Sequence, residues 1–323
     1  MMSAVLLVSH VILVLHAAAP AESIPVILDT DIGSDIDDTW ALAMMLGSPQ
    51  LDVRLITTAF RDTPVKTRLV AKMLERLNRT DIPIGTGLKT DDGGINQLEW
   101  LGDFDFKSYP GMVYEDGVQA LIDTIKKSER RITLVVLGPQ ANISEALKRD
   151  PSIAENARVV TMAGSVHIGY EGYEGRQPEW NVRADIAAAR AVFNAPWEIT
   201  MNPLDICGNL RLAGERYLRV SDSAAPRARV VIENYNAWSS RDSQPKNSSS
   251  ILFDTVTVYM SVDTSLCRME QVKLVIDDEG NTVPGENGRP VRCALGWKTL
   301  GAEDRYKELL IQALTNPAGA RYP

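Results

Sequence analysis

The sequence predicts an α/β fold, in which a single domain has a central, mostly parallel (mixed) sheet with helices on both faces. Short apolar runs of strand length alternate with longer segments of helical character, a pattern typical of parallel sheets. Polar residues follow directly after several of these runs, at the edge where such sheets bind ligands. No segment in the middle has the composition of a linker, so residues 22–323 are expected to form one domain.

The predicted elements begin with residues 24–28, an apolar run that ends at Asp29 and is expected to be a buried strand. Residues 39–46 have helical character, which the Gly and Pro of residues 47–49 are expected to end. Further strands are expected at residues 51–58, 82–84, 132–137, 158–162 and 199–204. Further helices are expected at residues 65–77, 117–127, 142–148 and 185–193. Two polar stretches are expected to form a loop near the ligand edge and a hairpin or surface connection: residues 241–250 and 280–290.

Residues 1–21 differ in composition from the rest of the chain. Residues 5–15 are almost continuously apolar, and small residues follow them up to Ala21. Such a core is too short to span a bilayer comfortably but suits a signal peptide, with cleavage before Glu22. No Lys or Arg precedes the core, which is atypical of a signal peptide. The alternative is a retained hydrophobic anchor or a wrongly assigned start of the chain. A signal peptide predicts an exported protein, periplasmic or secreted, with no stable membrane insertion after cleavage.

Charge and cysteine content exclude several classes of protein. The formal net charge is −8, from 34 basic and 42 acidic residues, so no nucleic-acid partner is expected. The three cysteines have neither the spacing of a zinc site nor that of a disulfide framework. They are expected to be buried small hydrophobic residues, with one disulfide as the alternative in an oxidising compartment: Cys207, Cys267 and Cys293.

The most unusual segment is an acidic cluster directly after the first strand, residues 29–38, which holds five carboxylates in ten residues. Crowded acids repel one another and raise one another's pKa values, a cost that a hard cation such as calcium or magnesium removes. Gly33 supplies the backbone freedom that a tight loop needs. Asp37 and Asp38 are expected in the first turn of the following helix, where the helix dipole favours anions. The cluster therefore predicts a metal site.

Other interpretations of the cluster fit less well. An EF-hand loop requires Glu at its twelfth position, and the twelfth residue counted from Asp29 is Trp40. A phosphatase nucleophile loop matches the spacing of Asp29 and Asp31, but that class would have Thr or Val in place of Gly33. A solvated acidic loop is unusual directly after a buried strand.

Residues 29–38 resemble the signature of the inosine-uridine nucleoside hydrolase family, Asp-x-Asp-x-Gly-x-Asp-Asp, with two extra residues before the final pair. Five further segments are similar to family motifs in the family's order: residues 57–62, 137–142, 162–165, 179–181 and 253–254. The resemblance covers residues 24–315. It implies the Rossmann-like nucleoside hydrolase fold, a nucleoside or N-riboside as substrate, and a homodimer or homotetramer.

By that resemblance the cofactor is Ca2+, held by oxygen ligands. The implied ligands are the carboxylates of Asp31, Asp38 and Asp254 and the backbone carbonyl of Leu137. Asp31 would also be the catalytic general base toward the attacking water, which calcium activates. The residues implied to bind the substrate, mainly at its ribose, are Asp37, Asp62, Glu179, Trp180 and Asn181. Asp35 belongs to the inserted pair, so its role as a further ligand or as a support for the ligands stays open.

For three of these residues, an interpretation without a role in substrate binding has to be considered. Glu179 and Asn181 could belong to a surface loop, in which case neither would touch a substrate. Trp180 is expected to be a wall residue packed in the core, with a surface on which a base stacks as the alternative.

Phe253 departs from the family, because many members have His at this position and use it to protonate the leaving purine. Phe cannot donate a proton, so another residue must activate the leaving group. His167 is one candidate, and a surface loop position is the alternative for it. Further candidates come from the segment where the family places its base-side wall: Tyr235, Trp238 and Arg241. The sequence leaves the preferred base open.

The predicted function is calcium-dependent hydrolysis of ribonucleosides, or related N-ribosides, to ribose and a free base. Because of Phe253, a non-catalytic calcium-dependent nucleoside- or ribose-binding protein is the first alternative. Asp31 argues against it, since binding alone needs no base. The second alternative is an Asp-x-Asp phosphatase with Asp29 as its nucleophile.

Overall fold

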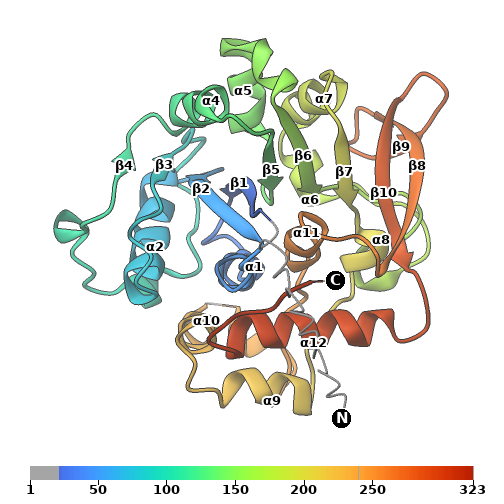
Figure 1. Cartoon of the computed structure of the whole chain (residues 1–323). Coiled ribbons are helices and arrows are strands. Elements are labelled where there is room, and N and C mark those ends of the chain that lie inside the picture. The colour runs from blue at the N-terminus through green and yellow to red at the C-terminus, as the bar shows by residue number, and fades with distance from the viewer. Residues whose placement is uncertain (1–21, 239, 323) are drawn as a thin grey trace, which may run out of the picture.

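The computed structural model describes residues 22–238 and 240–322. Ten strands form one sheet in the order β4-β3-β2-β1-β5-β6-β7-β10-β8-β9. The strands from β4 to β10 run from left to right in Figure 1, and β8 and β9 lie at its right-hand side. Neighbouring strands from β4 to β10 are parallel, whereas β8 is antiparallel to both β10 and β9. The predicted mostly parallel, mixed sheet is confirmed. The strands are β1 (Ile24–Thr30), β2 (Leu51–Thr58), β3 (Ile84–Thr86), β4 (Val113–Tyr114), β5 (Ile132–Val136), β6 (Ala157–Met162), β7 (Ile199–Asn202), β8 (Cys267–Ile276), β9 (Thr282–Pro284) and β10 (Arg289–Trp297).

Helices cover both faces of the sheet, because successive side chains of a buried strand point to opposite sides. In β1, Val26 and Leu28 belong to one apolar cluster and Ile27 to another. The first cluster includes residues of α1, α2 and α9 to α12, and the second includes residues of α4, α5 and α7. The longer helices are α1 (Asp37–Leu46), α2 (Thr63–Arg76), α4 (Gly117–Lys127), α5 (Ala141–Arg149), α7 (Ile186–Asn194), α9 (Glu215–Ser221), α10 (Pro226–Ala237) and α12 (Ala302–Thr315). The shorter ones are α3 (Leu98–Leu101), α6 (Trp180–Ala184), α8 (Leu204–Cys207) and α11 (Thr255–Met260).

The chain order of the strands reverses beside β1. Strands β2 to β4 lie on one side of β1, and β5 to β7 lie on the other. In open parallel sheets, ligands bind in the crevice outside the carboxyl ends of the strands at such a reversal. The acidic residues follow β1 at this point, and Leu137 follows β5. The two segments are neighbours, because Leu137 N donates a hydrogen bond to Asp29 O at 2.8 Å. The fold therefore brings two of the sequence motifs to one place.

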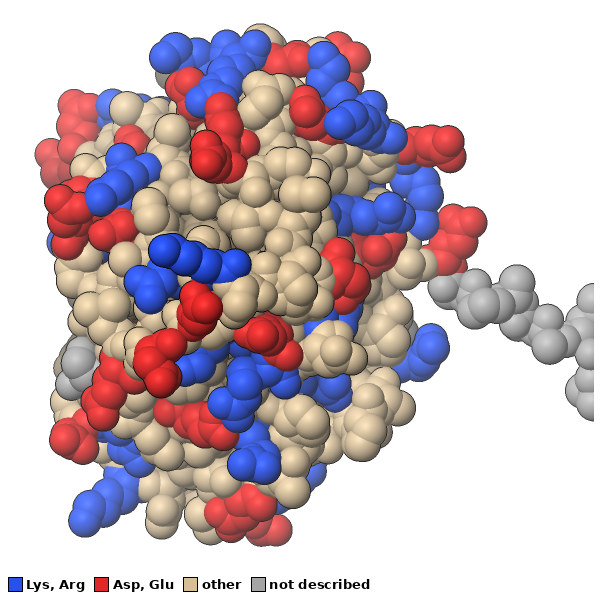
Figure 2. Space-filling model, turned by 90° about the vertical axis from the view of Figure 1, so that its left-hand side faces the viewer, with Lys and Arg blue, Asp and Glu red and all other residues tan. Residues whose placement is uncertain are grey.

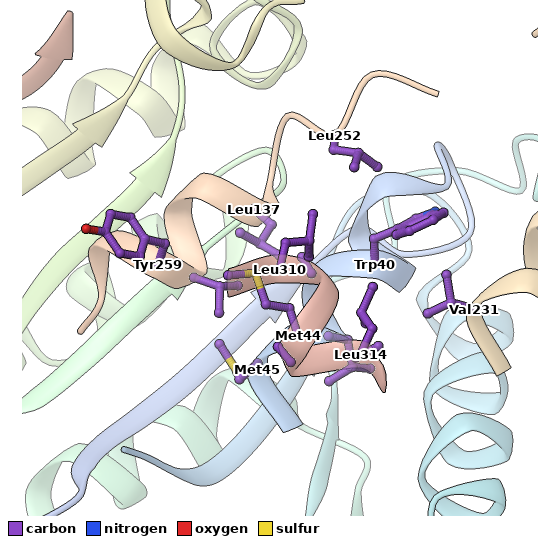
Figure 3. Close-up of a cluster of buried hydrophobic side chains, with 14 of the residues drawn as sticks. Trp40, Met44, Met45, Leu137, Val231, Leu252, Tyr259, Leu310 and Leu314 are labelled. Carbon is purple, nitrogen blue, oxygen red and sulfur yellow. The ribbon is translucent and has the colours of Figure 1, made fainter. Parts of the chain in front are cut away.

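Helix α1, which follows the acidic loop, is buried along almost its whole length. It contacts α10, α11 and α12, because a helix that is apolar all round must be covered on every side. Figure 3 shows Met44 of α1 close to Leu310 and Leu314 of α12. The acidic N-terminal end of α1 is thus anchored to the packed core.

Several predicted strands differ from the observed ones by one or two residues at an end, and at β3 and β7 a proline explains the difference. Strand β3 begins at Ile84 rather than at residue 82, because Pro83 has no N–H to donate to a neighbouring strand. Strand β7 ends at Asn202, because Pro203 follows it and α8 begins at Leu204. Apart from the hairpin or surface connection expected at residues 280–290, no helix or strand was predicted beyond residue 204, where the structure has α8 to α12 and β8 to β10. The hairpin expected within residues 280–290 contains β9, which pairs with β8.

The predicted signal peptide, residues 1–21, lies outside the described residues. Within residues 22–238 and 240–322, no helix combines the length and apolarity needed to cross a membrane.

The three cysteines are free and buried, as predicted. On the face in Figure 2, acidic and basic side chains are interspersed, so neither sign dominates that face.

Candidate active site

A cavity of about 340 Å³ opens at the carboxyl edge of the sheet. It is lined by residues that follow β1, β2, β5 and β6, together with residues near α6, α10 and α11. The predicted metal ligands, the predicted base and the predicted substrate-binding residues all line it except Asp62, and of the candidates for leaving-group activation only Trp238 lines it. The structure thus brings together motifs that are spread over most of the chain.

Three buried carboxylates that line the cavity lie close together: Asp37, Asp38 and Asp254. The first two begin α1, as predicted, and Asp254 directly precedes α11. One carboxylate oxygen from each lies within 4.8 Å of the others. Burial, reinforced by the neighbouring carboxylates, raises the pKa of each well above its ordinary value. A hard cation would offset this cost, and the oxygen-only donors fit one.

The three-carboxylate group differs in one member from the predicted ligand set, which had Asp31 in place of Asp37. Asp31 lines the same cavity, but it lies beside Lys66 of α2, whose side chain is fully buried. Lys66 Nζ donates to Asp31 O at 2.5 Å and to Ser34 Oγ at 2.7 Å, and lies 4.0 Å from Asp31 Oδ2. Burial raises the pKa of Asp31, and the Lys66 charge opposes that rise.

Gly138 allows the loop after β5 to approach Asp31. A Cβ at this position would lie 2.7 Å from Asp31 Cβ, so any larger residue would push the two segments apart. The side chain of Leu137, the preceding residue, is buried, as expected. The Leu137 carbonyl accepts a hydrogen bond from Asn181. The glycine therefore sets the separation between the proposed base and the proposed carbonyl ligand.

Asp29 is held away from the cavity, which it does not line. Its Oδ1 accepts hydrogen bonds from Thr57 Oγ1 at 2.5 Å and Asn142 Nδ2 at 2.7 Å. Burial raises the pKa of its carboxyl to about 6. A phosphatase would need this carboxylate free to attack a substrate, so the geometry argues against that alternative.

The inserted loop that carries Asp35 is tied to a segment that the sequence analysis did not single out. Asn96 Nδ2 donates to Ser34 O at 2.6 Å, and Gln97 Nε2 donates to Asp35 O at 2.7 Å. The Asp35 side chain lines the cavity, and burial raises its pKa. The insertion is therefore a fixed part of the cavity wall.

Glu179 and Asn181 are buried, so the surface-loop alternative for them is wrong. Glu179 caps α6: its Oε1 accepts from Asn181 N at 2.7 Å, and its Oε2 accepts from Gly164 N and Val182 N. Despite these donors, burial raises its pKa to about 7. Because each carboxylate oxygen can accept two hydrogen bonds, Oε1 retains one acceptor position for a ligand.

Asn181 connects this side of the cavity to the acidic side. Its Nδ2 donates to Leu137 O at 2.6 Å and to Met162 O at 3.1 Å. A carbonyl oxygen has two acceptor positions, so Leu137 O can receive this bond and also bind a cation. The amide thereby orients the carbonyl that the sequence analysis expected as a metal ligand.

Aromatic side chains form the outer part of the cavity. Trp180 is 40% exposed and packs edge-on against Phe60, with ring centroids 6.2 Å apart, so the expectation that it packs in the core is wrong. Phe60 and Arg61 line the cavity with φ values of 63° and 59°, a left-handed conformation that is uncommon for residues other than glycine. Such strain persists only where the surrounding structure enforces it.

Two predicted site residues are placed elsewhere. Asp62 caps α2, where its Oδ1 accepts from Val65 N at 3.4 Å, and its carboxylate lies 3.7 Å from Lys89 Nζ. His167 is exposed on a loop and does not line the cavity. Of the base-side candidates, Trp238 lines the cavity. Sequence reasoning had no signal for Lys66, Tyr170 or Asn96, which stand outside the family-like motifs.

Comparisons with known proteins identify the family and match the fold of the chain. The family described as inosine-uridine preferring nucleoside hydrolase matches residues 26–305. The pyrimidine-specific ribonucleoside hydrolase RihA of Escherichia coli O1:K1 / APEC is 31% identical over 222 residues, 65% of this chain and 70% of that protein. A plant nucleoside hydrolase, PpNRh1, superposes with a TM-score of 0.77 at 23% identity, covering 91% of this chain and 99% of its own. A purine-preferring ribonucleoside hydrolase from Gardnerella vaginalis superposes with a TM-score of 0.74 at 21% identity, covering 90% and 99%. The chain therefore belongs to the inosine-uridine preferring nucleoside hydrolase family and is a hydrolase of N-glycosyl compounds.

Proposed function

We propose that the protein hydrolyses the N-glycosidic bond of ribonucleosides to ribose and a free base, with calcium as its cofactor. One observation carries this proposal: a single cavity brings the acidic residues after β1 together with Asp254, Glu179 and Asn181. These groups offer oxygen ligands for a cation, a carboxylate beside it, and polar groups for sugar hydroxyls. A family member with this arrangement has the parts that riboside hydrolysis requires.

The cation would be held by Asp37, Asp38 and Asp254, with the Leu137 carbonyl and Asp31 beside them. Calcium suits such a site better than magnesium, because it accepts more oxygen ligands in a less regular geometry. When bound, the ion would lower the pKa of the attacking water and orient it.

Asp31 is the proposed general base. It lines the cavity, and the nearby Lys66 charge favours its ionised form, as a base needs. Glu179 would accept a hydrogen bond from a ribose hydroxyl through the remaining position on Oε1. Together with Asn181 it would stabilise the positive charge that develops on the sugar as the base departs.

A substrate panel tests the function. Purified full-length protein is incubated with uridine, cytidine, inosine and adenosine, with calcium or with a chelator, and free ribose is measured. Similarity to a pyrimidine-specific relative makes uridine and cytidine the first substrates to examine. We expect ribose release with calcium and its loss with the chelator. Saturable nucleoside binding without ribose release would instead support the binding-protein alternative that Phe253 suggests.

A further inference from the structure

The cavity has Phe253 at the position where many family members have the His that protonates the leaving base. Phe253 lines the cavity and offers only an apolar ring. When the N-glycosidic bond breaks, the base departs with the bonding electron pair, and negative charge develops on it. A hydrogen-bond donor aimed at that charge lowers the barrier. Another side chain must therefore supply it.

Most of the candidates from the sequence are excluded by their contacts. Tyr235 is fully buried, and its hydroxyl donates to Ser248 O at 3.0 Å. Arg241 lies over the Tyr235 ring at 4.7 Å and does not line the cavity. His167 is exposed outside it. Trp238 lines the cavity with a buried Nε1 that has no partner among the described residues, so it stays in the comparison.

Tyr170 lies directly beside Phe253. Its ring packs edge-on against Phe253, with centroids 5.9 Å apart and an interplanar angle of 83°. Its Oη accepts a hydrogen bond from Trp180 N at 2.8 Å, the amide between Glu179 and Asn181. The hydroxyl therefore lies between the proposed ribose residues and the position where the family's donor would be.

The Tyr170 hydroxyl has a proton to offer. Among the described residues it accepts the Trp180 N–H, and none accepts a hydrogen bond from it. The segment is fixed, since Tyr170 N donates to Gln177 Oε1 and Glu171 N donates to Gly208 O, both at 2.9 Å. Burial and the nearby Glu179 carboxylate raise the pKa of Tyr170, so the hydroxyl stays protonated at neutral pH.

We propose that Tyr170 is the catalytic hydrogen-bond donor to the departing base, in place of a side chain at position 253. This inference rests on the proposed function. The bond from the anomeric carbon to the base nitrogen breaks, and a bond from that carbon to the water oxygen forms. Asp31 takes the proton of the water, and the base leaves with the electron pair while Tyr170 Oη–H donates to it. The base then takes a proton from solvent, and Asp31 returns its proton to solvent.

The substrate class follows from this assignment. The base must carry an acceptor beside its glycosidic nitrogen, as the 2-carbonyl of a pyrimidine or N3 of a purine does. A riboside with an activated leaving group needs no such donor, because a group such as 4-nitrophenolate departs as a stable anion.

The test compares the two substrate classes in the calcium-loaded full-length protein. Turnover of uridine and of 4-nitrophenyl riboside is measured for the wild type, Tyr170→Phe, Trp238→Phe and the control Tyr173→Phe. Tyr173 is 66% exposed and does not line the cavity, so its variant should match the wild type. We expect Tyr170→Phe to lower kcat on uridine about 100-fold and to change kcat on the activated riboside less than about 2-fold. Retained activity on the activated riboside also shows that the variant is folded.

Three outcomes would overturn the inference while leaving the proposed function intact. Tyr170→Phe could keep full uridine turnover, or lose activity on both substrates equally. Trp238→Phe could show the selective loss on uridine that we expect of Tyr170→Phe. Failure of the wild type on both substrates would overturn the proposed function, and the inference with it.

Discussion

Glu179 is a buried acid whose charge is opposed by its surroundings. Three backbone N–H groups donate to its carboxylate, yet burial outweighs them and raises the pKa from 4.5 to about 7. The folded state therefore binds the Glu179 proton more tightly than the unfolded state does. Its contribution to stability is fully present below pH 4.5 and is lost as the pH rises to about 7.

We expect the metal-free wild type to lose stability relative to Glu179→Gln between pH 4.5 and pH 7. The relative loss should be about 3 kcal/mol, since one pKa unit corresponds to about 1.4 kcal/mol. Urea unfolding of both proteins across this range, with a chelator present, measures it. Stability curves that run parallel would show that the Glu179 pKa is not raised in the folded protein.

The sequence predicted most residues that line the cavity because they belong to compact motifs at strand ends. It missed Lys66 because a lysine in a helix normally faces water, and only the folded structure shows it buried beside Asp31. It missed Tyr170 because that residue lies in an irregular loop whose packing against Phe253 has no local signature. Asp62, which the sequence analysis assigned to the ribose, caps α2 and does not line the cavity, since an acid before a helix serves equally well as a cap.

Helix α2 acts on the acidic loop through one side chain. Lys66 donates to Asp31 O and to Ser34 Oγ, so the helix holds the loop and also places a positive charge beside its acids. We expect Lys66→Met to lower the free energy of unfolding by about 2–4 kcal/mol, because two buried acceptors lose their donor and an acid loses its counter-charge.

Urea unfolding of the metal-free proteins measures this effect. Lys148→Met is the matched control, because Lys148 on α5 is 81% exposed and its loss should change stability by less than about 0.5 kcal/mol. Equal stability of both variants would contradict the role assigned to Lys66.

At the scale of elements, prediction succeeded where apolar runs were short and buried on both faces, as in β1, β2, β5 and β6. It failed in the C-terminal part for physical reasons. Strand β8 is long and carries charged residues on a partly exposed face, and α1-covering helices such as α10 are not strongly amphipathic. These elements are defined by what they pack against, which a local pattern does not contain.

The acidic cluster combines residues that lie far apart in the chain. Asp37 and Asp38 come from the first helix, while Asp254 directly precedes α11, more than 200 residues further along the chain. A cation bound between them would link distant parts of the fold, and only the folded protein has this arrangement. Binding should therefore stabilise the native state as a whole.

We expect calcium at about 100 times its Kd to raise the free energy of unfolding by about 2.7 kcal/mol over the chelated protein. Thermal unfolding with calcium, magnesium or chelator measures the shift, which should be larger for calcium. Asp254→Asn should abolish the shift, and its metal-free form should be at least as stable as the metal-free wild type, because one of three crowded charges is gone. An unchanged Tm in calcium would contradict the metal site.

The most direct test of the account compares the wild type with Asp31→Asn. Asn has nearly the same shape and leaves the Lys66 bond to the backbone carbonyl intact, but it cannot accept the proton of the attacking water. Ribose release from the preferred nucleoside and equilibrium binding of that nucleoside are measured side by side, both with calcium. We expect turnover to fall by about 1,000-fold or more while the Kd changes by less than about 5-fold. Turnover that survives the substitution would contradict the assignment of Asp31 as the general base of a nucleoside hydrolase.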